Sequence, residues 1–129
     1  MNTTGFHHIG LKYKNLDRSL EFYKAIGLRE VVRWGDPGDE IVMMAMDDGG
    51  IIELLPYRGE EFSENGKWIH FAIKVADVDK AYETALAAGA VSLIAPKVVP
   101  LDSKPEKMSI NIAFVKGPDG EELEFFKVV

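Results

Sequence analysis

The first regular pattern in the chain is an alternation of apolar and polar side chains over residues 6–13. His8, Gly10 and Lys12 fall on one face of this segment, and aliphatic or aromatic side chains fall on the other. Because successive residues of a strand point to opposite faces, this period of two predicts a β-strand. The strand is expected to be apolar on one face and to carry a histidine on the other.

A helical pattern follows this strand. Apolar residues recur at the spacing of one helix face from Leu16 onward, and Asn15 or Asp17 can cap the start. Gly27 suits the left-handed backbone that often ends a helix. We therefore predict a helix that runs to about Gly27.

Short strands separated by turn sequences fill the rest of the first half. Asp-Pro-Gly-Asp at 36–39 and Asp-Asp-Gly-Gly at 47–50 are typical turn sequences. A polar, glycine-containing segment at 58–67 is predicted to be a linker. The predicted strands are 28–33, 41–46 and 51–55.

The chain then repeats itself at an offset of 62 residues. His8 matches His70, and Gly27 matches Gly89. The second half is predicted to have strands at 68–75, 91–94, 110–115 and 122–128 and a helix at 77–89. The segment 95–109 carries three prolines, and we predict extended chain at its start and a loop after it.

The ends of the two halves also match. Asp48-Gly49-x-x-x-Glu53 corresponds to Asp119-Gly120-x-x-x-Glu124. We therefore predict an α+β fold of two tandem βαβββ modules, residues 5–57 and 68–129, in one domain spanning residues 1–129. If the modules pack about an approximate two-fold axis, their equivalent faces meet at an open cleft.

Four polar residues in the predicted strands are equivalent in pairs: His8 with His70, and Glu53 with Glu124. Two imidazole nitrogens and two carboxylates suit a divalent transition metal. The other interpretation is that the histidines pack as ordinary strand residues and the glutamates face solvent. The residues alone leave both interpretations open.

Composition narrows the class of protein. The 129 residues are 47% hydrophobic and 28% charged, as in an ordinary globular protein, and the net charge is −6. Scattered Lys and Arg residues argue against a nucleic-acid partner. The absence of cysteine excludes disulfides and thiolate metal sites. The sequence shows neither a secretory signal nor a long apolar run, so no membrane association and a cytoplasmic location are expected.

The motifs together resemble the vicinal-oxygen-chelate superfamily, which includes glyoxalase I, bleomycin resistance proteins and extradiol dioxygenases. The resemblance implies two βαβββ modules that form a cleft or open barrel around a metal ion. It also implies a homodimer, in which a second chain can complete the site. The motifs are His8-Ile9-Gly10-Leu11, Leu16 to Tyr23, Ile52-Glu53-Leu54, His70-Phe71-Ala72, and Phe114-Val115-x-x-Pro118-Asp119-Gly120-x-x-x-Glu124.

Carried over position by position, the resemblance implies His8, Glu53, His70 and Glu124 as ligands of one divalent metal ion. His7 falls one place away, and we interpret it as structural. The glutamate at position 53 most resembles bacterial glyoxalase I (lactoylglutathione lyase). That enzyme favours Ni²⁺ or Co²⁺; Zn²⁺, Mn²⁺ or Fe²⁺ also suit such a site.

The resemblance implies a lyase or isomerase that transfers a proton through a metal-stabilised enediolate of a small α-oxygenated substrate, such as a hemithioacetal. Glu124 is expected to transfer the proton, with Glu53 as its partner. Substrate contacts are expected from Lys12, Lys74, Tyr57 and Arg58, with a possible contribution from residues 95–109.

Other functions in the superfamily stay open. Lys12 stands where glyoxalase I commonly has arginine, and Tyr57 stands where it commonly has asparagine, so the substrate need not be a glutathione adduct. The alternatives are an enzyme similar to methylmalonyl-CoA epimerase or extradiol dioxygenase, and a non-enzymatic binding protein of the bleomycin resistance type.

Overall fold

Two compact units make up the chain, residues 1–62 and 63–129. The computed structural model describes residues 6–59, 70–103 and 105–129. The boundary between the units falls inside the predicted linker 58–67, most of which lies outside the described residues.

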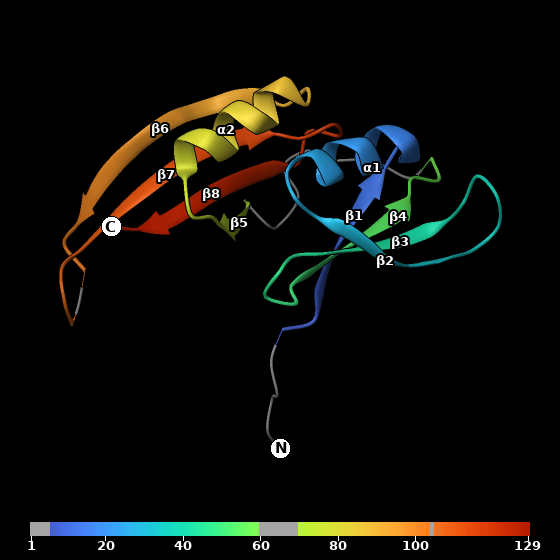
Figure 1. The fold of residues 1–129 in the computed structure, drawn as a ribbon. Helices are drawn as coiled ribbons and strands as arrows, with labels where there is room; N and C mark the ends of the chain where they lie inside the picture. The colour runs from blue at the N-terminus through green and yellow to red at the C-terminus, as the bar shows by residue number, and fades with distance from the viewer. Residues whose placement is uncertain (1–5, 60–69, 104) are drawn as a thin grey trace, which may run out of the picture. The chain divides into compact units, whose positions relative to one another are not determined.

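The first unit is a four-stranded sheet with one helix (Figure 1). Its strand order is β1-β4-β3-β2, in which β1 runs parallel to β4 and the other pairs are antiparallel. The predicted order of elements is confirmed for this half of the chain. The elements are β1 (His8–Tyr13), α1 (Leu16–Ala25), β2 (Arg29–Trp34), β3 (Ile41–Ala45) and β4 (Ile51–Pro56).

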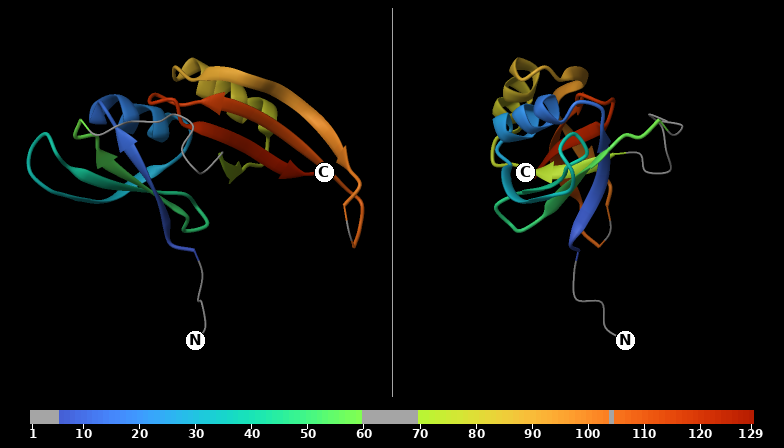
Figure 2. Two further views of the ribbon diagram at one scale, coloured as in Figure 1. Left: turned by 180° about the vertical axis from the view of Figure 1, so that it is seen from behind. Right: turned by 90° about the vertical axis from the view of Figure 1, so that its right-hand side faces the viewer.

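The second unit has the same topology, with strand order β5-β8-β7-β6 and a parallel pair formed by β5 and β8. Its helix α2 packs against β6, β7 and β8, and Figure 2 shows it along one face of this sheet. The predicted repeat of one βαβββ module is therefore confirmed. The elements are β5 (Phe71–Lys74), α2 (Val78–Ala87), β6 (Val91–Leu101), β7 (Met108–Lys116) and β8 (Glu122–Val128).

The two helices begin and end with equivalent residues. Asn15 and Asp77 are the N-caps, and each side chain accepts a hydrogen bond from the backbone N–H three residues later, at 3.0 Å. Asn15 rather than Asp17 is thus the cap of the first helix. Gly27 and Gly89 follow the helices with φ of 105° and 103°, a backbone that favours glycine. Within the described residues, no helix is long and apolar enough to cross a membrane.

The extended chain predicted at the start of segment 95–109 is part of a strand. β6 continues from the predicted strand 91–94 to Leu101 and pairs with β7 as far as Met108. Pro96 and Pro100 lie inside it. The sheet tolerates these prolines because β6 is its edge strand, and an edge strand hydrogen-bonds to a neighbour on one side only. Its register shifts between Ser92 and Lys97, which accommodates the first proline.

One face of the parallel strand pair is buried in each unit, as the alternation predicts. On β1 and β4, Leu11, Tyr13, Ile52 and Leu54 are at most 5% exposed. On β5 and β8, the equivalent strands of the second unit, Ile73, Leu123 and Phe125 are buried. The residues between them alternate to the other face, which carries the predicted histidines and glutamates.

Candidate functional site

In the first unit, strand register brings the predicted histidine and glutamate together. Gly10 on β1 is the Cα partner of Glu53 on β4. Because side chains two residues apart on a strand share a face, His8 lies diagonally opposite Glu53 on the same face. His8 Nε2 is 3.8 Å from Glu53 Oε1, and the two side chains are 38% and 14% exposed.

Gly10 keeps the space beside this pair open. A Cβ atom at this position would lie 3.1 Å from Cδ1 of Leu55, which shares the face of Glu53. A larger side chain would therefore displace Leu55 or crowd the His8–Glu53 pair. The absence of a side chain at Gly10 therefore has a structural reason.

The second unit repeats the geometry with a shorter contact. Ala72 on β5 is the Cα partner of Glu124 on β8. His70, two residues before Ala72, has its Nε2 atom 3.0 Å from Glu124 Oε2. Glu124 is buried at 8% exposure. At this distance the imidazole is a polar partner for a carboxylate that burial would otherwise penalise.

Phe114 on β7 supports this pair. It is the cross-strand partner of Glu124, and its ring meets the ring of His70 edge to face, with centroids 5.0 Å apart and an interplanar angle of 84°. Aromatic rings favour this geometry. Phe114 was not among the predicted site residues; its signal in the sequence was its place in the motif that ends at Glu124.

The donor atoms fit a divalent metal ion. Each unit offers one imidazole nitrogen and one carboxylate oxygen, separated by 3.8 Å for His8–Glu53 and 3.0 Å for His70–Glu124. Neighbouring ligands with metal bonds of about 2.0–2.2 Å lie about 3 Å apart. The second pair has this spacing. The distance in the first pair is longer, and rotation of either side chain would bring the two atoms to the same spacing.

The structure brings together two of the four predicted ligands in each unit. Among the described residues, no group of three or more His, Cys, Asp or Glu is placed to hold a metal ion. The set of His8, Glu53, His70 and Glu124 around one ion therefore stays a prediction.

His7, which the sequence analysis interpreted as structural, contacts the ring of His8. Its Nδ1 atom is 2.9 Å from Nδ1 of His8, and the two rings meet at 85° with centroids 5.2 Å apart. His7 precedes β1, which begins at His8, so strand alternation does not fix the direction of its ring.

The two predicted lysines are exposed and share strand faces with the site. Lys12 follows Gly10 by two residues, and Lys74 follows Ala72 by two residues. Side chains at this spacing point to the same side of the strand. Each lysine is thus placed on the face that carries the His–Glu pair of its own unit.

Tyr57 and Arg58 lie beyond the end of β4, next to Tyr13. The Tyr57 N–H donates to the carbonyl of Tyr13 at 2.9 Å, and Lys14 Nζ lies 5.6 Å from the centre of the Tyr57 ring. The Tyr13 hydroxyl donates to the carbonyl of Glu40 at 2.7 Å. Burial raises the pKa of Tyr13, the charge of Glu40 raises it further, and Arg58 opposes the shift.

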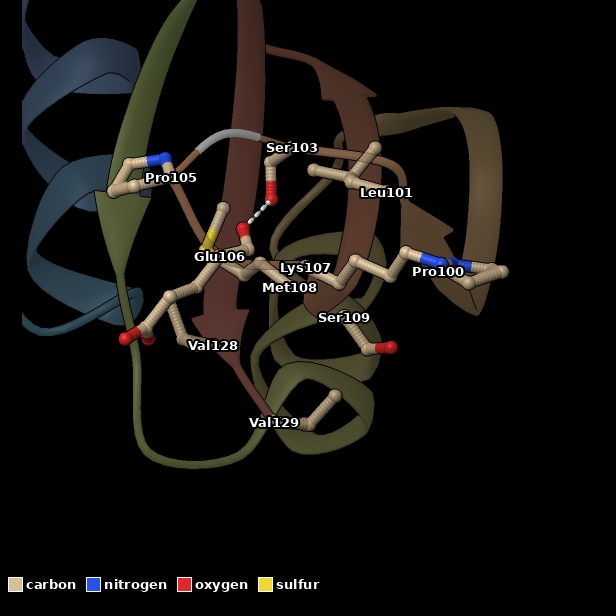
Figure 3. A pocket seen from close by; sticks show the side chains of 10 residues that line it. All are labelled: Pro100, Leu101, Ser103, Pro105, Glu106, Lys107, Met108, Ser109, Val128 and Val129. Atoms are coloured by element: carbon tan, nitrogen blue, oxygen red, sulfur yellow. Dashed lines mark hydrogen bonds between the residues drawn. The ribbon is translucent and has the colours of Figure 1, made fainter.

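A surface pocket in the second unit involves the segment 95–109 (Figure 3). Ser103 Oγ donates to the carbonyl of Glu106 across the turn between β6 and β7, at 2.5 Å. The pocket is lined by part of the segment 95–109, which the sequence analysis named for substrate contacts, and by none of the individually predicted metal or substrate residues. The lining residues are Pro100, Leu101, Ser103, Pro105, Glu106, Lys107, Met108, Ser109, Val128 and Val129.

Two βαβββ units with equivalent His–Glu pairs on their parallel strands define a class of protein built from a duplicated module. The chain belongs to the Glyoxalase/Bleomycin resistance protein/Dioxygenase superfamily, whose family model matches residues 5–125. The resemblance drawn from the sequence motifs is thereby confirmed at the level of the superfamily.

Relatives of the chain span most of its length. YwbC, an uncharacterized protein of Bacillus subtilis (strain 168), is 25% identical over 125 residues, which are 93% of this chain and 94% of YwbC. A glyoxylase/bleomycin resistance protein/dioxygenase domain from Frankia sp. EAN1pec has a TM-score of 0.77 and 21% identity, covering 99% of this chain and 100% of that one. The trypanothione-dependent glyoxalase I of Leishmania major has a TM-score of 0.70 and 22% identity, covering 97% and 87%. The structural matches support the fold.

Proposed function

We propose that the protein is a metal-dependent lyase or isomerase of the glyoxalase I type, acting on a small α-oxygenated substrate such as a hemithioacetal. The observation that carries the proposal is the repeated His–Glu pair: His8 with Glu53, and His70 with Glu124, at equivalent places in two units of one fold. Superfamily membership supports it.

In this proposal the four side chains hold one divalent ion, with Ni²⁺ or Co²⁺ favoured. Each histidine would bind through Nε2, the ring nitrogen that faces the carboxylate of its own unit. The bound ion supplies Lewis acidity, which lowers the cost of negative charge on adjacent substrate oxygens.

Glu124 is the proposed proton carrier. Its carboxylate takes a proton from the carbon beside the substrate oxygen and returns it to the neighbouring carbon. Its burial at 8% exposure keeps bulk water from competing for that proton. His70 and Phe114 hold the carboxylate in place, and Glu53 is its counterpart in the first unit.

Cationic side chains set the proposed substrate class. Lys12 and Lys74 are exposed on the faces of the two pairs and would attract an anionic group on the substrate. Tyr57 and Arg58 are further candidates, beside Tyr13 at the end of β4. Lysine presents a compact point charge and lacks the two-point contact that arginine makes with a carboxylate. Lys12 therefore fits a substrate other than a glutathione adduct.

We also propose a homodimer. The edge strands β2 and β6 carry exposed apolar side chains, among them Val32 and Trp34 at 47% and 43% exposure, and Val91 and Val98 at 63% and 60%. Exposed apolar edges are commonly covered by a partner. Light scattering behind a sizing column should give twice the mass of one chain, and the mass of a single chain would contradict the dimer.

Metal analysis of protein purified without chelator is the first test of the enzyme. About one divalent ion per site is expected, and both His70→Ala and Glu124→Gln should lose it. The exposed helix variant Glu21→Gln is the matched control and should keep it. A protein that neither contains nor binds a divalent ion would contradict the enzyme and favour a ligand-binding role.

Proton exchange identifies the reaction. Hemithioacetal and α-hydroxyketone substrates should lose a carbon-bound deuteron to water in the presence of the metal-loaded protein. Glu124→Gln should abolish this exchange. Exchange confined to acyl-CoA substrates would replace the glyoxalase reaction with that of an epimerase.

A further inference from the structure

Both nitrogens of the His8 ring face a defined partner within the first unit. Nε2 points toward Glu53 Oε1 at 3.8 Å, and Nδ1 lies 2.9 Å from Nδ1 of His7. The His7 ring is nearly perpendicular to that of His8, at 85°. The two ring nitrogens of His8 therefore face different groups, and Nδ1 takes no part in the proposed metal contact.

A hydrogen bond between two Nδ1 atoms needs one proton. If Nε2 of neutral His8 gives its lone pair to a cation, its only ring proton must be on Nδ1. His8 Nδ1–H then donates to His7, whose Nδ1 accepts and whose own proton lies on Nε2. This arrangement fixes both the tautomer and the ring orientation that a metal ligand needs.

We propose that His7 is a positioning residue of the metal site, whose Nδ1 accepts the Nδ1–H of His8 and so holds the His8 Nε2 lone pair toward Glu53. This inference rests on the proposed function, because it assigns His7 a role toward the same ion. His7 touches neither the ion nor the substrate in this role.

The sequence repeat supports the assignment by contrast. The residue at the place equivalent to His7 is Ile69, which has no side-chain nitrogen. His70 is instead held by the ring of Phe114 and by the 3.0 Å contact with Glu124. The first unit, whose His–Glu contact is longer and whose histidine is more exposed, is the one with a second imidazole beside the ligand.

The test compares His7→Phe with His7→Asn in the full-length protein. Phenylalanine keeps a ring but has no acceptor, whereas the Asn Oδ1 atom can take the place of Nδ1. Affinity for Ni²⁺ and Zn²⁺ would be measured by competition with a metallochromic chelator. His7→Phe is expected to lower affinity about tenfold, the lower end for loss of such a partner, because water reaches the partly exposed His8. His7→Asn should stay within about threefold of the unmodified protein.

Nuclear magnetic resonance of ¹⁵N-histidine-labelled, Zn²⁺-loaded protein gives a readout apart from affinity and activity. The His8 Nδ1–H proton should exchange slowly with water in the unmodified protein and in His7→Asn. It should exchange quickly in His7→Phe. Circular dichroism and thermal unfolding should be the same for all three, because His7 is exposed.

Each contrary outcome has its own meaning. Equal affinity and equal proton exchange in His7→Phe and the unmodified protein would overturn the role of His7 and leave the proposed function standing. An equal loss in His7→Asn and His7→Phe would overturn positioning, since it would indicate that His7 is itself a ligand. An unmodified protein that binds no divalent ion would overturn both proposals.

Discussion

His70 Nε2 lies 3.0 Å from Glu124 Oε2, whereas the equivalent atoms of His8 and Glu53 are 3.8 Å apart. One sequence pattern has thus produced a closed pair and an open pair. The closed pair has the more buried carboxylate, at 10% side-chain exposure against 14%. It therefore contributes to folding as well as to the proposed chemistry, and the open pair contributes less.

Removal of each histidine from metal-free protein should separate these contributions. His70→Ala leaves the buried Glu124 carboxylate without its imidazole partner, which should lower the free energy of unfolding by about 1–3 kcal/mol. His8→Ala breaks only a 3.8 Å contact and should cost less than about 1 kcal/mol. Urea unfolding measures both. A larger loss for His8→Ala would contradict the ranking.

The turn before β8 should not accept a side chain at Gly117. A Cβ atom there would lie 2.5 Å from Glu121 Oε1, which accepts a hydrogen bond from the Asp119 N–H at 2.8 Å. Because Glu121 is buried at 8% exposure, it cannot move away freely. Gly117→Ala should lower the free energy of unfolding by about 1–3 kcal/mol in urea.

A double-mutant cycle is the control for this turn. In a Glu121→Ala background the obstructing carboxylate is gone, so Gly117→Ala should cost less than in the unmodified protein. An equal cost in both backgrounds would show that the backbone of Gly117, and not its contact with Glu121, sets the requirement.

Stability should depend on pH through Glu30 and Arg33 on β2. Arg33 Nη2 donates to Glu30 Oε1 at 2.5 Å, and this hydrogen bond lowers the pKa of Glu30 below its ordinary value of 4.5. A carboxyl with a lowered folded pKa stabilises the protein above its unfolded pKa, and this stabilisation is lost as pH falls through the folded pKa. Arg33→Gln should therefore cost about 0.2–1 kcal/mol at neutral pH and almost nothing in acid.

Arg29→Gln is the matched control for the pH dependence. Arg29 donates to Asp47 at 3.2 Å, but the Asp47 side chain is fully exposed. An exposed pair of this kind contributes little, so the control should change stability less than Arg33→Gln at neutral pH. Urea unfolding at several pH values compares the two, and an Arg33→Gln cost that persists in acid would contradict the role of Glu30.

Gly10 should be required for metal binding more than for folding. Gly10→Val places a strand-favouring side chain in register with Glu53 and against Leu55, so the fold should persist while the His8–Glu53 pair is displaced. Affinity for Ni²⁺ should fall about tenfold in a chelator competition assay. Adding Leu55→Ala should restore part of it, and unchanged affinity in Gly10→Val would contradict the crowding.

The sequence by itself determined the duplicated module and the order of its elements. Helix caps, left-handed glycines and the period of two are local properties, so Asn15, Asp77, Gly27 and Gly89 could be located without the fold. The length of β6 could not. Proline lacks the N–H that a neighbouring strand would accept, so its cost depends on whether a strand lies on that side. The position of β6 at a sheet edge is set by the tertiary structure.

The sequence also indicated the histidine and glutamate of each unit, because both repeat within predicted strands. Only the tertiary structure decided how each pair is held. The parallel register of Gly10 with Glu53, the ring of Phe114 against His70 and the contact of His7 with His8 come from chain pairing and side-chain rotation. No local pattern encodes such distances, because they depend on which neighbours the packed fold supplies.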